Sequence, residues 1–345
     1  MHTIAFFDTK PYDKTYFNEY NKNYKIKYFE SKLHENSYTL AKGADVVCAF
    51  VNDTLSETVI QGLYELGVKV IAMRSSGYNN VDVKSAYGKI TIVRVPAYSP
   101  NAVAELAMTL LLTINRKVHR AYNRTRDFNF SLAGLVGFDM VGKTVGVIGT
   151  GRIGQVFIQI ARGFGMNVIA YDPFPNQNLD VKYASLDDLF KQSDIISLHC
   201  PLTEDTKHII NEKSIQLMKN GVVIINTSRG GLIESNSLLK GLKEGKIRAA
   251  GLDVYEEEAD IFFEDNSNTI MQDDVLSLLV SLPNVIITSH QGFLTEEALS
   301  NIAETTLKNL DQYFGDELLE NEICYLCKDG RAAYECRHHQ KKRCF

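Results

Sequence analysis

Short apolar runs alternate with helical patterns along almost the whole sequence, and this alternation constrains the fold more than any other feature. Such a pattern is typical of parallel sheets covered by helices. The runs form two sets, which predicts an α/β fold of two doubly wound parallel-sheet domains. The predicted strands are residues 3–8, 24–29, 45–50, 68–73 and 90–95 in the first set, and 143–149, 167–172, 194–200, 222–228, 249–255 and 284–289 in the second.

Two helical patterns indicate where the domains join along the chain. From about Asn101 to Arg126 apolar residues recur at helical spacing, which predicts one long helix serving as hinge and interface. Residues 295–314 follow the last predicted strand and begin with acidic side chains, as a helix N-terminus prefers. We expect this segment to return to the first domain. Residues 1–100 and 296–345 would then form one discontinuous domain, and residues 101–295 the other.

The composition excludes several classes of partner. A hydrophobic content of 45% over 345 residues suits about two globular domains. The net charge of -5, from 37 basic and 42 acidic residues, gives no basic excess for binding nucleic acid or an anionic membrane. The N-terminus lacks the apolar region of a signal peptide, and no apolar run reaches the roughly 18 to 20 residues of a transmembrane helix. We therefore expect a cytoplasmic protein with a small soluble partner.

A glycine-rich turn lies between the first strand of the second set and the following helical pattern. Gly149, Gly151 and Gly154 form G-x-G-x-x-G, in which the glycines permit a tight turn, close approach of backbone to a pyrophosphate, and close helix–strand packing. Asp172 ends the next predicted strand, where an acid accepts hydrogen bonds from the adenosine ribose hydroxyls and repels a 2′-phosphate. The motif in this context predicts a Rossmann nucleotide-binding domain that uses NAD rather than NADP. The alternative is a structural turn in which Asp172 caps the next element.

Two further loop residues, Arg152 and Ile153, are counted with the cofactor-binding residues. The Arg152 side chain either lies over the pyrophosphate or is simply solvated, and the sequence favours neither possibility.

Three polar side chains follow predicted strands of the second set, namely Arg229, Glu258 and His290. Open α/β sheets bind their ligands at the carboxyl ends of strands. A histidine, whose ordinary pKa is about 6.5, can give a proton to a carbonyl oxygen and take it back from a hydroxyl. A carboxylate on its other nitrogen would orient the ring, and an arginine would hold a substrate carboxylate beside a carbonyl. The three residues thus predict hydride transfer between a nicotinamide and a carbinol, without a metal.

Each of these residues has a plainer interpretation. His290 could satisfy backbone groups at a strand end, Glu258 lies in the acidic run EEEAD that is typical of solvated surface, and Arg229 could pair with Glu234. Three complementary groups after a nucleotide-binding loop favour the functional interpretation over three coincidences.

Four segments, GTGRIGQ, NTSRGGLIE, GLDVYEEE and TSHQGFLTEEAL, resemble in order and spacing the D-2-hydroxyacid dehydrogenases. VRVPAYSPNAVAELA and FFEDNSNTIMQDDVLSLL are similar to the fermentative D-lactate branch of that family, and the resemblance spans roughly residues 2 to 322. It implies a flavodoxin-like substrate domain built from both chain ends, a central NAD domain, and reduction of pyruvate to D-lactate by NADH.

The resemblance also assigns residues by position. Arg229 matches the substrate-binding arginine, Glu258 the acid paired with histidine, and His290 the acid/base. In the substrate domain it implies a carboxylate-binding loop and a pocket; in the nucleotide domain it implies further cofactor contacts. These residues are Ser76 and Gly77 in the loop, Tyr98, Phe50 and Phe293 in the pocket, and Asp253 and Thr227 near the cofactor. Core packing is the alternative for Phe50 and Tyr98.

Several points stay open at the level of sequence. The substrate is pyruvate or, alternatively, a larger 2-keto acid or glyoxylate, and an NAD-sensing binding protein of the same fold is a third hypothesis. We expect a homo-oligomer, a dimer or tetramer assembled through the nucleotide domains. The C-terminal tail departs from the family pattern: it either ligates zinc or forms an exposed extension. Its relevant residues are Cys324, Cys327, Cys336, Cys344, His338 and His339.

Overall fold

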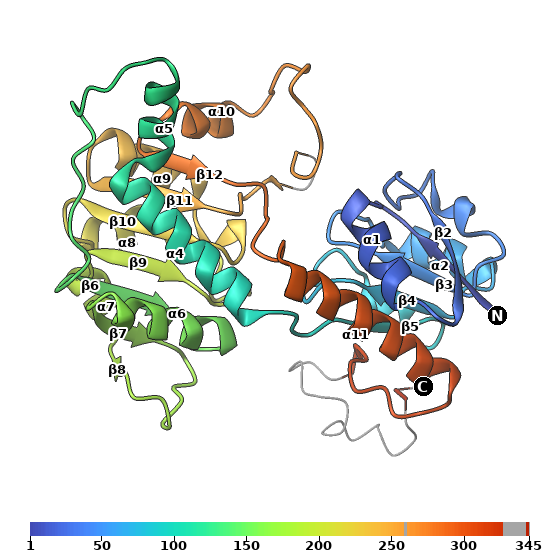
Figure 1. Cartoon of the computed structure of the whole chain (residues 1–345). Coiled ribbons are helices and arrows are strands. Elements are labelled where there is room, and N and C mark those ends of the chain that lie inside the picture. The colour runs from blue at the N-terminus through green and yellow to red at the C-terminus, as the bar shows by residue number, and fades with distance from the viewer. Residues whose placement is uncertain (259–260, 327–342, 345) are drawn as a thin grey trace. The chain divides into compact units, whose positions relative to one another are not determined.

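A computed structural model describes residues 1–258, 261–326 and 343–344. The chain divides into two compact units: unit 1 is Met1–Ser99 with Leu294–Phe345, and unit 2 is Pro100–Phe293. Each unit is built on one parallel sheet (Figure 1). The expected class, α/β with two parallel sheets covered by helices, is confirmed.

The sheet of unit 1 has five parallel strands in the order β2-β1-β3-β4-β5, which is the flavodoxin-like order. Its central strands are almost completely buried, because helices cover both faces and leave no position for an alternating polar pattern. The strands are β1 (His2–Phe6), β2 (Tyr24–Tyr28), β3 (Val46–Ala49), β4 (Val70–Met73) and β5 (Thr91–Arg94).

The helices of unit 1 come from both ends of the chain. Helix α11 packs against α1 and against β4 and β5, although some 200 residues separate it from β5 in sequence (Figure 1). Its N-terminus is capped by Thr295, whose side chain accepts a hydrogen bond from the N–H of Ala298. The helical elements are α1 (Pro11–Tyr20), η1 (Tyr38–Ala41), α2 (Glu57–Glu65), α3 (Val83–Ala86) and α11 (Glu296–Phe314).

The sheet of unit 2 has seven parallel strands in the order β12-β11-β10-β9-β6-β7-β8. Counted from β6, this is the Rossmann order, in which the direction of progress reverses between β6 and β9 and opens a crevice at the carboxyl ends. The strands are β6 (Thr144–Ile148), β7 (Asn167–Tyr171), β8 (Lys182–Tyr183), β9 (Ile195–Leu198), β10 (Val222–Asn226), β11 (Ile247–Leu252) and β12 (Val285–Ile287).

Helices cover both faces of this sheet. Apolar side chains of α4 and α6 pack with β6, β9 and β10 in one core, while those of α7 to α10 form a second core on the opposite face. The helical elements are α4 (Pro100–Arg116), α5 (Val118–Arg126), α6 (Arg152–Gly163), α7 (Leu186–Gln192), α8 (Glu212–Leu217), η2 (Gly230–Leu232), α9 (Ser235–Lys243) and α10 (Asp274–Ser281).

Two sequence-based expectations for unit 2 were wrong. The single helix predicted from Asn101 to Arg126 is two helices, α4 and α5, because Lys117 adopts a left-handed conformation with φ of 51°. Helical periodicity continues across such a break, so it gives no warning. The edge strand β8 was missed, since two residues are too few for a periodic signal.

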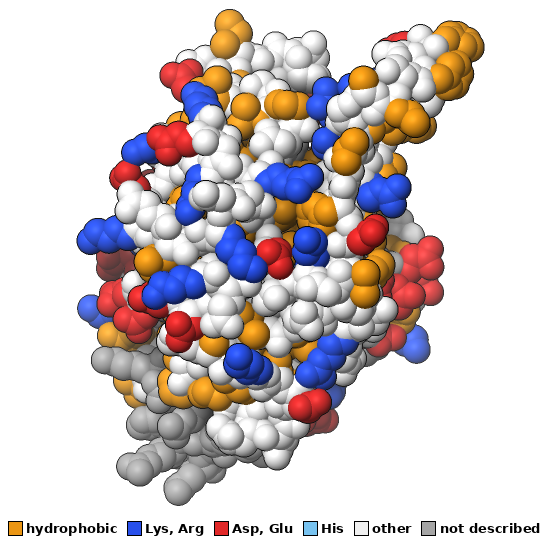
Figure 2. Space-filling model, turned by 90° about the vertical axis from the view of Figure 1, so that its left-hand side faces the viewer, with side chains coloured by type: hydrophobic (Ala, Val, Ile, Leu, Met, Phe, Trp, Pro, Cys, Tyr) orange, Lys and Arg blue, Asp and Glu red, His pale blue; other side chains and the backbone are white. Residues whose placement is uncertain are grey.

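The other expectations can be compared with particular residues. Cys48 and Cys200, which lie in apolar runs of the sequence, are buried free thiols. In the tail, Cys327, Cys336, His338 and His339 lie outside the described residues; within the described part, no group of three metal-ligating side chains occurs. No helix in the described ranges is long and apolar enough to cross a membrane. Figure 2 shows basic and acidic side chains interspersed over the face that it draws.

Candidate active site

The glycine turn lies at the carboxyl end of β6, directly before α6. Gly149 has φ of 96°, and a Cβ there would lie 2.6 Å from the carbonyl carbon of His199. A Cβ on Gly154 would overlap the carbonyl oxygen of Gly149, whereas nothing lies within 4 Å of the corresponding point at Gly151. The first and third glycines are therefore required by packing, and the second leaves open space above the turn.

The N-terminus of α6 fits the phosphates of a dinucleotide. Its N-cap residue, Gly151, provides no side-chain hydrogen bond, so the first N–H groups of this helix are not capped by a side chain. Free N–H groups and the positive end of the helix dipole together favour an anion. Arg152, the first helical residue, is exposed, and Ile153 packs against the α4–α6 core.

The carboxylate of Asp172, directly after β7, is held against this turn. Oδ2 accepts hydrogen bonds from the N–H and the hydroxyl of Thr150, at 2.7 and 2.9 Å. Oδ1 accepts one hydrogen bond, from the N–H of Phe174 at 2.9 Å. Asp172 thus holds the glycine turn that precedes it in the sequence, while Oδ1 keeps capacity for a ligand hydroxyl.

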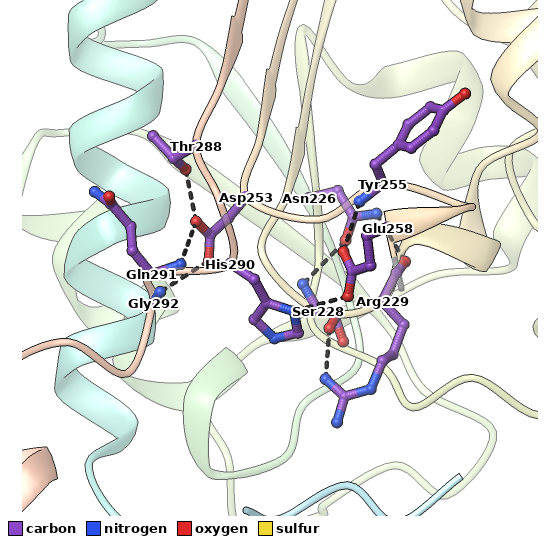
Figure 3. Close-up of polar contacts among 10 residues, drawn as sticks. All are labelled: Asn226, Ser228, Arg229, Asp253, Tyr255, Glu258, Thr288, His290, Gln291 and Gly292. Atoms are coloured by element: carbon purple, nitrogen blue, oxygen red, sulfur yellow. Dashed lines mark hydrogen bonds and ion pairs between the residues drawn. The ribbon is translucent and has the colours of Figure 1, made fainter. Parts of the chain in front are cut away.

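His290 and Glu258 form a hydrogen-bonded pair in unit 2. Nδ1 of His290 lies 2.8 Å from Oε1 of Glu258, and the two side chains are only 17% and 19% exposed. The second carboxylate oxygen accepts a hydrogen bond from the N–H of Tyr255 at 2.9 Å. No described residue bonds to the other ring nitrogen, Nε2, which remains available for proton exchange. Figure 3 shows the Glu258 carboxylate directed at the ring of His290.

Asp253 holds the backbone around His290. Its buried carboxylate accepts hydrogen bonds from the Thr288 hydroxyl at 2.6 Å and from the N–H groups of Gln291 and Gly292, both at 2.8 Å (Figure 3). Its backbone carbonyl accepts the N–H of His290 at 2.7 Å. His290 has φ of 54°, a strained conformation for a residue with a side chain, and these bonds over-determine it. Burial raises the pKa of Asp253 above its ordinary value.

Arg229 and Thr227 follow β10 at the same edge of the sheet. The Arg229 guanidinium donates to the carbonyl of Ser228 at 2.6 Å, and no ion pair with Glu234 occurs in the described part of the chain. Asn226 shapes this turn, donating to the Arg229 carbonyl and accepting from the Ser228 N–H. The buried hydroxyl oxygen of Thr227 has no hydrogen-bond partner among the described residues. Such an orphaned polar atom beside the turn fits a polar group of a bound cofactor.

The expected carboxylate-binding loop follows β4 in unit 1. The hydroxyl of Ser76 donates to the Pro96 carbonyl at 3.1 Å, and its carbonyl accepts from Arg94 at 2.9 Å. The N–H groups of Ser76 and Gly77 have no acceptor among the described residues. The hydrogen bonds to Pro96 and Arg94 hold the loop in place and leave two backbone N–H donors for an anion.

The three predicted pocket residues have different environments. Phe50 is only 6% exposed, and its ring packs on the buried guanidinium of Arg74, 4.6 Å away. Phe293 is 7% exposed and lies 6.4 Å from the ring of Phe263. Tyr98 is half-buried, and its carbonyl accepts a hydrogen bond from Asn301. The structure brings Phe293 into unit 2 with Arg229, Glu258 and His290, and it places Phe50, Ser76, Gly77 and Tyr98 in unit 1.

Sequence reasoning missed the residues that hold the site in place. Thr150 and Tyr183 belong to the Asp172 end, and Asn226, Thr288 and Gln291 to the His290 end. Small polar residues after strands occur throughout such folds, so only the hydrogen bonds distinguish these. The one available signal was Thr150, which lies inside the glycine motif.

The fold and these side chains define a class of enzyme. The sequence model of the D-isomer specific 2-hydroxyacid dehydrogenase NAD-binding domain matches residues 108–292. Together with the relatives described next, this match shows that the chain belongs to the D-isomer specific 2-hydroxyacid dehydrogenases. The protein is an NAD-dependent D-2-hydroxyacid dehydrogenase, as the glycine turn and the His290–Glu258 pair led us to expect.

Individual relatives are similar over nearly their whole length. A 2-hydroxyacid dehydrogenase homolog of Haemophilus influenzae is 50% identical over 93% of this chain and 98% of its own. The D-lactate dehydrogenase of Escherichia coli is 49% identical over 93% of this chain and 99% of its own. Its apo-structure matches with a TM-score of 0.86 at 47% identity, covering 93% of this chain and 99% of that chain. The structure of the Chlamydomonas reinhardtii pyruvate reductase matches with a TM-score of 0.88 at 43% identity, covering 93% and 98%.

Proposed function

We propose that this protein is a D-lactate dehydrogenase that reduces pyruvate to D-lactate with NADH and catalyses the reverse oxidation. The observation that carries the proposal is the His290–Glu258 pair, whose Nδ1 and Oε1 atoms are 2.8 Å apart, with no described residue bonded to Nε2 of the ring. When bound, NADH supplies the hydride. The chain must supply a proton, a cation and a site for the substrate carboxylate.

His290 supplies the proton. Protonated at Nε2, the ring donates to the substrate carbonyl oxygen as that oxygen gains charge, and it recovers the proton during alcohol oxidation. Glu258 accepts from Nδ1–H, which fixes the tautomer and stabilises the imidazolium. The low exposure of both side chains strengthens this interaction over that of a surface pair.

Arg229 and the Ser76–Gly77 loop bind the carboxylate and polarise the carbonyl. The guanidinium presents a fork of donors and carries a permanent charge. Among the described residues its one hydrogen bond is to the Ser228 carbonyl, which leaves most of those donors for a ligand. The two N–H groups of the loop provide further donors, while Phe50, Tyr98 and Phe293 limit the substrate side chain. In this proposal unit 1 is the substrate domain and unit 2 the cofactor domain.

The cofactor residues follow from the same geometry. The N-terminus of α6, with Gly149, Gly151 and Gly154, would hold the phosphates, and Arg152 and Ile153 would flank them. Oδ1 of Asp172 would accept a hydrogen bond from the adenosine ribose. Thr227 and Asp253 would hold the nicotinamide end; the three hydrogen bonds to the Asp253 carboxylate also hold residues 288–292.

Two relatives with informative names support this substrate class. The Escherichia coli protein is a D-lactate dehydrogenase, and the Chlamydomonas reinhardtii protein is described as a pyruvate reductase. A D-2-hydroxyisocaproate dehydrogenase structure also matches, at 35% identity and a TM-score of 0.81, so a larger 2-keto acid is the second candidate. A homo-oligomer and a cytoplasmic location remain predictions. Support for the oligomer comes from exposed apolar side chains between residues 118 and 141, including Phe128, Phe130 and Leu132.

The test is loss of NADH absorbance with pyruvate, alongside glyoxylate, 2-ketoisocaproate and phenylpyruvate, with the chirality of the product determined. We expect pyruvate to give the highest kcat/KM and the product to be D-lactate. A preference for another 2-keto acid would change the substrate assigned to the enzyme and leave the proposed mechanism unchanged. NADH binding without turnover of any acid would favour the NAD-sensing alternative.

Arg229→Gln tests the substrate-binding role. Loss of the fork removes charge stabilisation of the developing oxyanion, so kcat/KM for pyruvate should fall by about 100-fold or more while the Kd for NADH stays unchanged. Arg162→Gln, at the exposed end of α6, is the matched control and should have wild-type kinetics. Equal kinetics for the two variants would refute this role.

A further inference from the structure

A chain of hydrogen bonds leads from the edge strand β8 to the carboxylate of Asp172. The Asn176 N–H donates to the Tyr183 hydroxyl at 3.0 Å, and the Tyr183 hydroxyl donates to the Thr150 hydroxyl at 3.0 Å. The Thr150 hydroxyl donates to Oδ2 of Asp172 at 2.9 Å. Each hydroxyl both accepts and donates in the same direction, which strengthens successive bonds in such a chain.

We call this chain of hydrogen bonds, from Asn176 through Tyr183 and Thr150 to Asp172, the relay. The surrounding structure restrains its members. Tyr183 is held by the pairing of β8 with β7, in which Ala170 lies opposite Tyr183. Thr150 is 4% exposed, and its carbonyl accepts a hydrogen bond from the Gln155 side chain at 2.9 Å. The relay therefore connects a strand edge, the glycine turn and Asp172 through groups with little freedom to move.

The relay determines which oxygen of Asp172 is available. Oδ2 accepts two hydrogen bonds from Thr150, which occupies both of its lone pairs. Oδ1 accepts one, from Phe174, and keeps one lone pair for a ribose hydroxyl. A freely rotating carboxylate could turn away from the 2′-phosphate of NADPH. The Asp172 carboxylate can turn only after its hydrogen bonds to Thr150 and Phe174 break.

We propose that Thr150 and Tyr183 are positioning residues for cofactor selectivity, which hold the Asp172 carboxylate in the orientation that accepts NADH and rejects NADPH. The inference rests on the proposed role of Asp172 and is independent of which 2-keto acid is reduced. Neither residue needs to touch the cofactor for this effect.

The test compares the dissociation constants of NADH and NADPH for Thr150→Val, Tyr183→Phe and the double variant. The chain has no tryptophan, so nucleotide fluorescence can be followed without an indole background. Thr150→Val removes one hydrogen bond to a charged group, and the ratio Kd(NADPH)/Kd(NADH) should fall about tenfold. Tyr183→Phe acts one bond further away and should lower the ratio about threefold.

The double variant tests whether the two residues act in series. Once the Thr150 hydroxyl is absent, the Tyr183 hydroxyl has no route to Asp172, so Tyr183→Phe should add nothing in that background. Thr150→Ser keeps the hydroxyl and should retain the wild-type ratio. Tyr171→Phe, on the adjacent strand β7, is the matched control, because no hydrogen bond of its hydroxyl occurs in the described part of the chain.

Asp172→Asn separates failure of the relay from failure of the premise. If this variant lowers the ratio while Thr150→Val and Tyr183→Phe leave it unchanged, Asp172 acts alone and the proposal is overturned. If Asp172→Asn also leaves the ratio unchanged, the role proposed for Asp172 is wrong and the inference fails with it. An equal rise of both dissociation constants, with a lower melting temperature, would show a purely structural role and also overturn the proposal.

Discussion

Two histidines of unit 2 pair with glutamates, and they differ in how they are held. His290 bonds to Glu258 through Nδ1 at 2.8 Å, whereas His208 bonds to Glu256 through Nε2 at 2.5 Å. Both histidines have positive φ, 54° and 53°, and in both pairs the second carboxylate oxygen accepts a backbone N–H. The two pairs therefore share the same residue types, the same backbone conformation at the histidine and the same kind of second hydrogen bond to the carboxylate.

The difference lies in which nitrogen is used and what supports the backbone. Because Nδ1, which lies next to the main chain, bonds to Glu258, Nε2 of His290 at the far end of the ring has no partner among the described residues. In His208 that outer nitrogen bonds to Glu256. The buried acid Asp253 holds the His290 segment, and the His290 pair is less exposed. A histidine–carboxylate pair is thus insufficient to indicate an acid/base; the unbonded Nε2 and the rigid support are the features on which the role proposed for His290 rests.

The largest expected effect compares the two histidines directly. His290→Gln removes the proton donor, so kcat for pyruvate reduction should fall by about 100-fold or more while NADH still binds. His208→Gln should change kcat by less than about threefold, because the His208 ring is hydrogen-bonded to Glu256 and contributes to the structure only. Steady-state kinetics and NADH titration of both variants decide the matter. Similar losses in the two would remove the distinction drawn here.

Asp253→Asn tests the support beneath His290. An asparagine has one acceptor oxygen where the carboxylate had two, so at least one of the three donors from residues 288–292 loses its partner. We expect a loss of roughly 1 to 3 kcal/mol in the free energy of unfolding and a fall of about tenfold or more in kcat as His290 leaves its geometry. Chemical denaturation and kinetics measure the two effects. Thr288→Val removes only the side-chain donor and should be milder; a wild-type kcat in Asp253→Asn would contradict the positioning role.

The paired glutamates should differ in their influence on turnover. In the proposed mechanism the Glu258 carboxylate accepts from Nδ1–H and orients the ring of His290, so Glu258→Gln should lower kcat for pyruvate reduction by about tenfold or more while NADH still binds. Glu256→Gln should change kcat by less than about threefold. Steady-state kinetics of the two variants measure this difference. A larger loss in Glu256→Gln than in Glu258→Gln would reverse the roles of the pairs.

The smallest expected effect concerns stability at the His208 pair. Burial acts to raise the pKa of Glu256, but hydrogen bonds from Ser235 and His208 outweigh it, and the net pKa lies below the ordinary value. A lowered carboxyl pKa contributes stability above the ordinary pKa that is lost as pH falls through the folded value. Because the pair is partly solvated, we expect Glu256→Gln to lower the free energy of unfolding at neutral pH by less than about 1 kcal/mol. The difference from wild type should vanish in acid; a difference that grew there would contradict this sign.

The sequence predicted the main features of the fold and the positions of candidate site residues after its strands. Short apolar runs marked eleven of the twelve strands, and the runs are continuous in the central strands, which are buried on both faces and have no polar positions. Gly149, Gly151 and Gly154 were recognisable because their spacing lies between a predicted strand and a helical pattern. Arg229, Glu258 and His290 stood out because three complementary groups follow strands downstream of a nucleotide-binding loop.

Tertiary structure alone decided which hydrogen bonds hold these side chains in place. Strand β8 and the contacts of Asp253 depend on pairing between residues that are apart in sequence. The break at Lys117 is a left-handed backbone conformation that helical periodicity does not reveal. The sequence distinguishes His290 by its place after a predicted strand, but it does not show which nitrogen of His290 or of His208 bonds to a glutamate. The choice of Nδ1 for one and Nε2 for the other follows from where the glutamates lie in space. By itself the sequence determined which chemical groups follow the strands at the sheet edges. The three-dimensional fold decided which atoms of those groups remain free to react, because their other atoms form hydrogen bonds with segments distant in sequence.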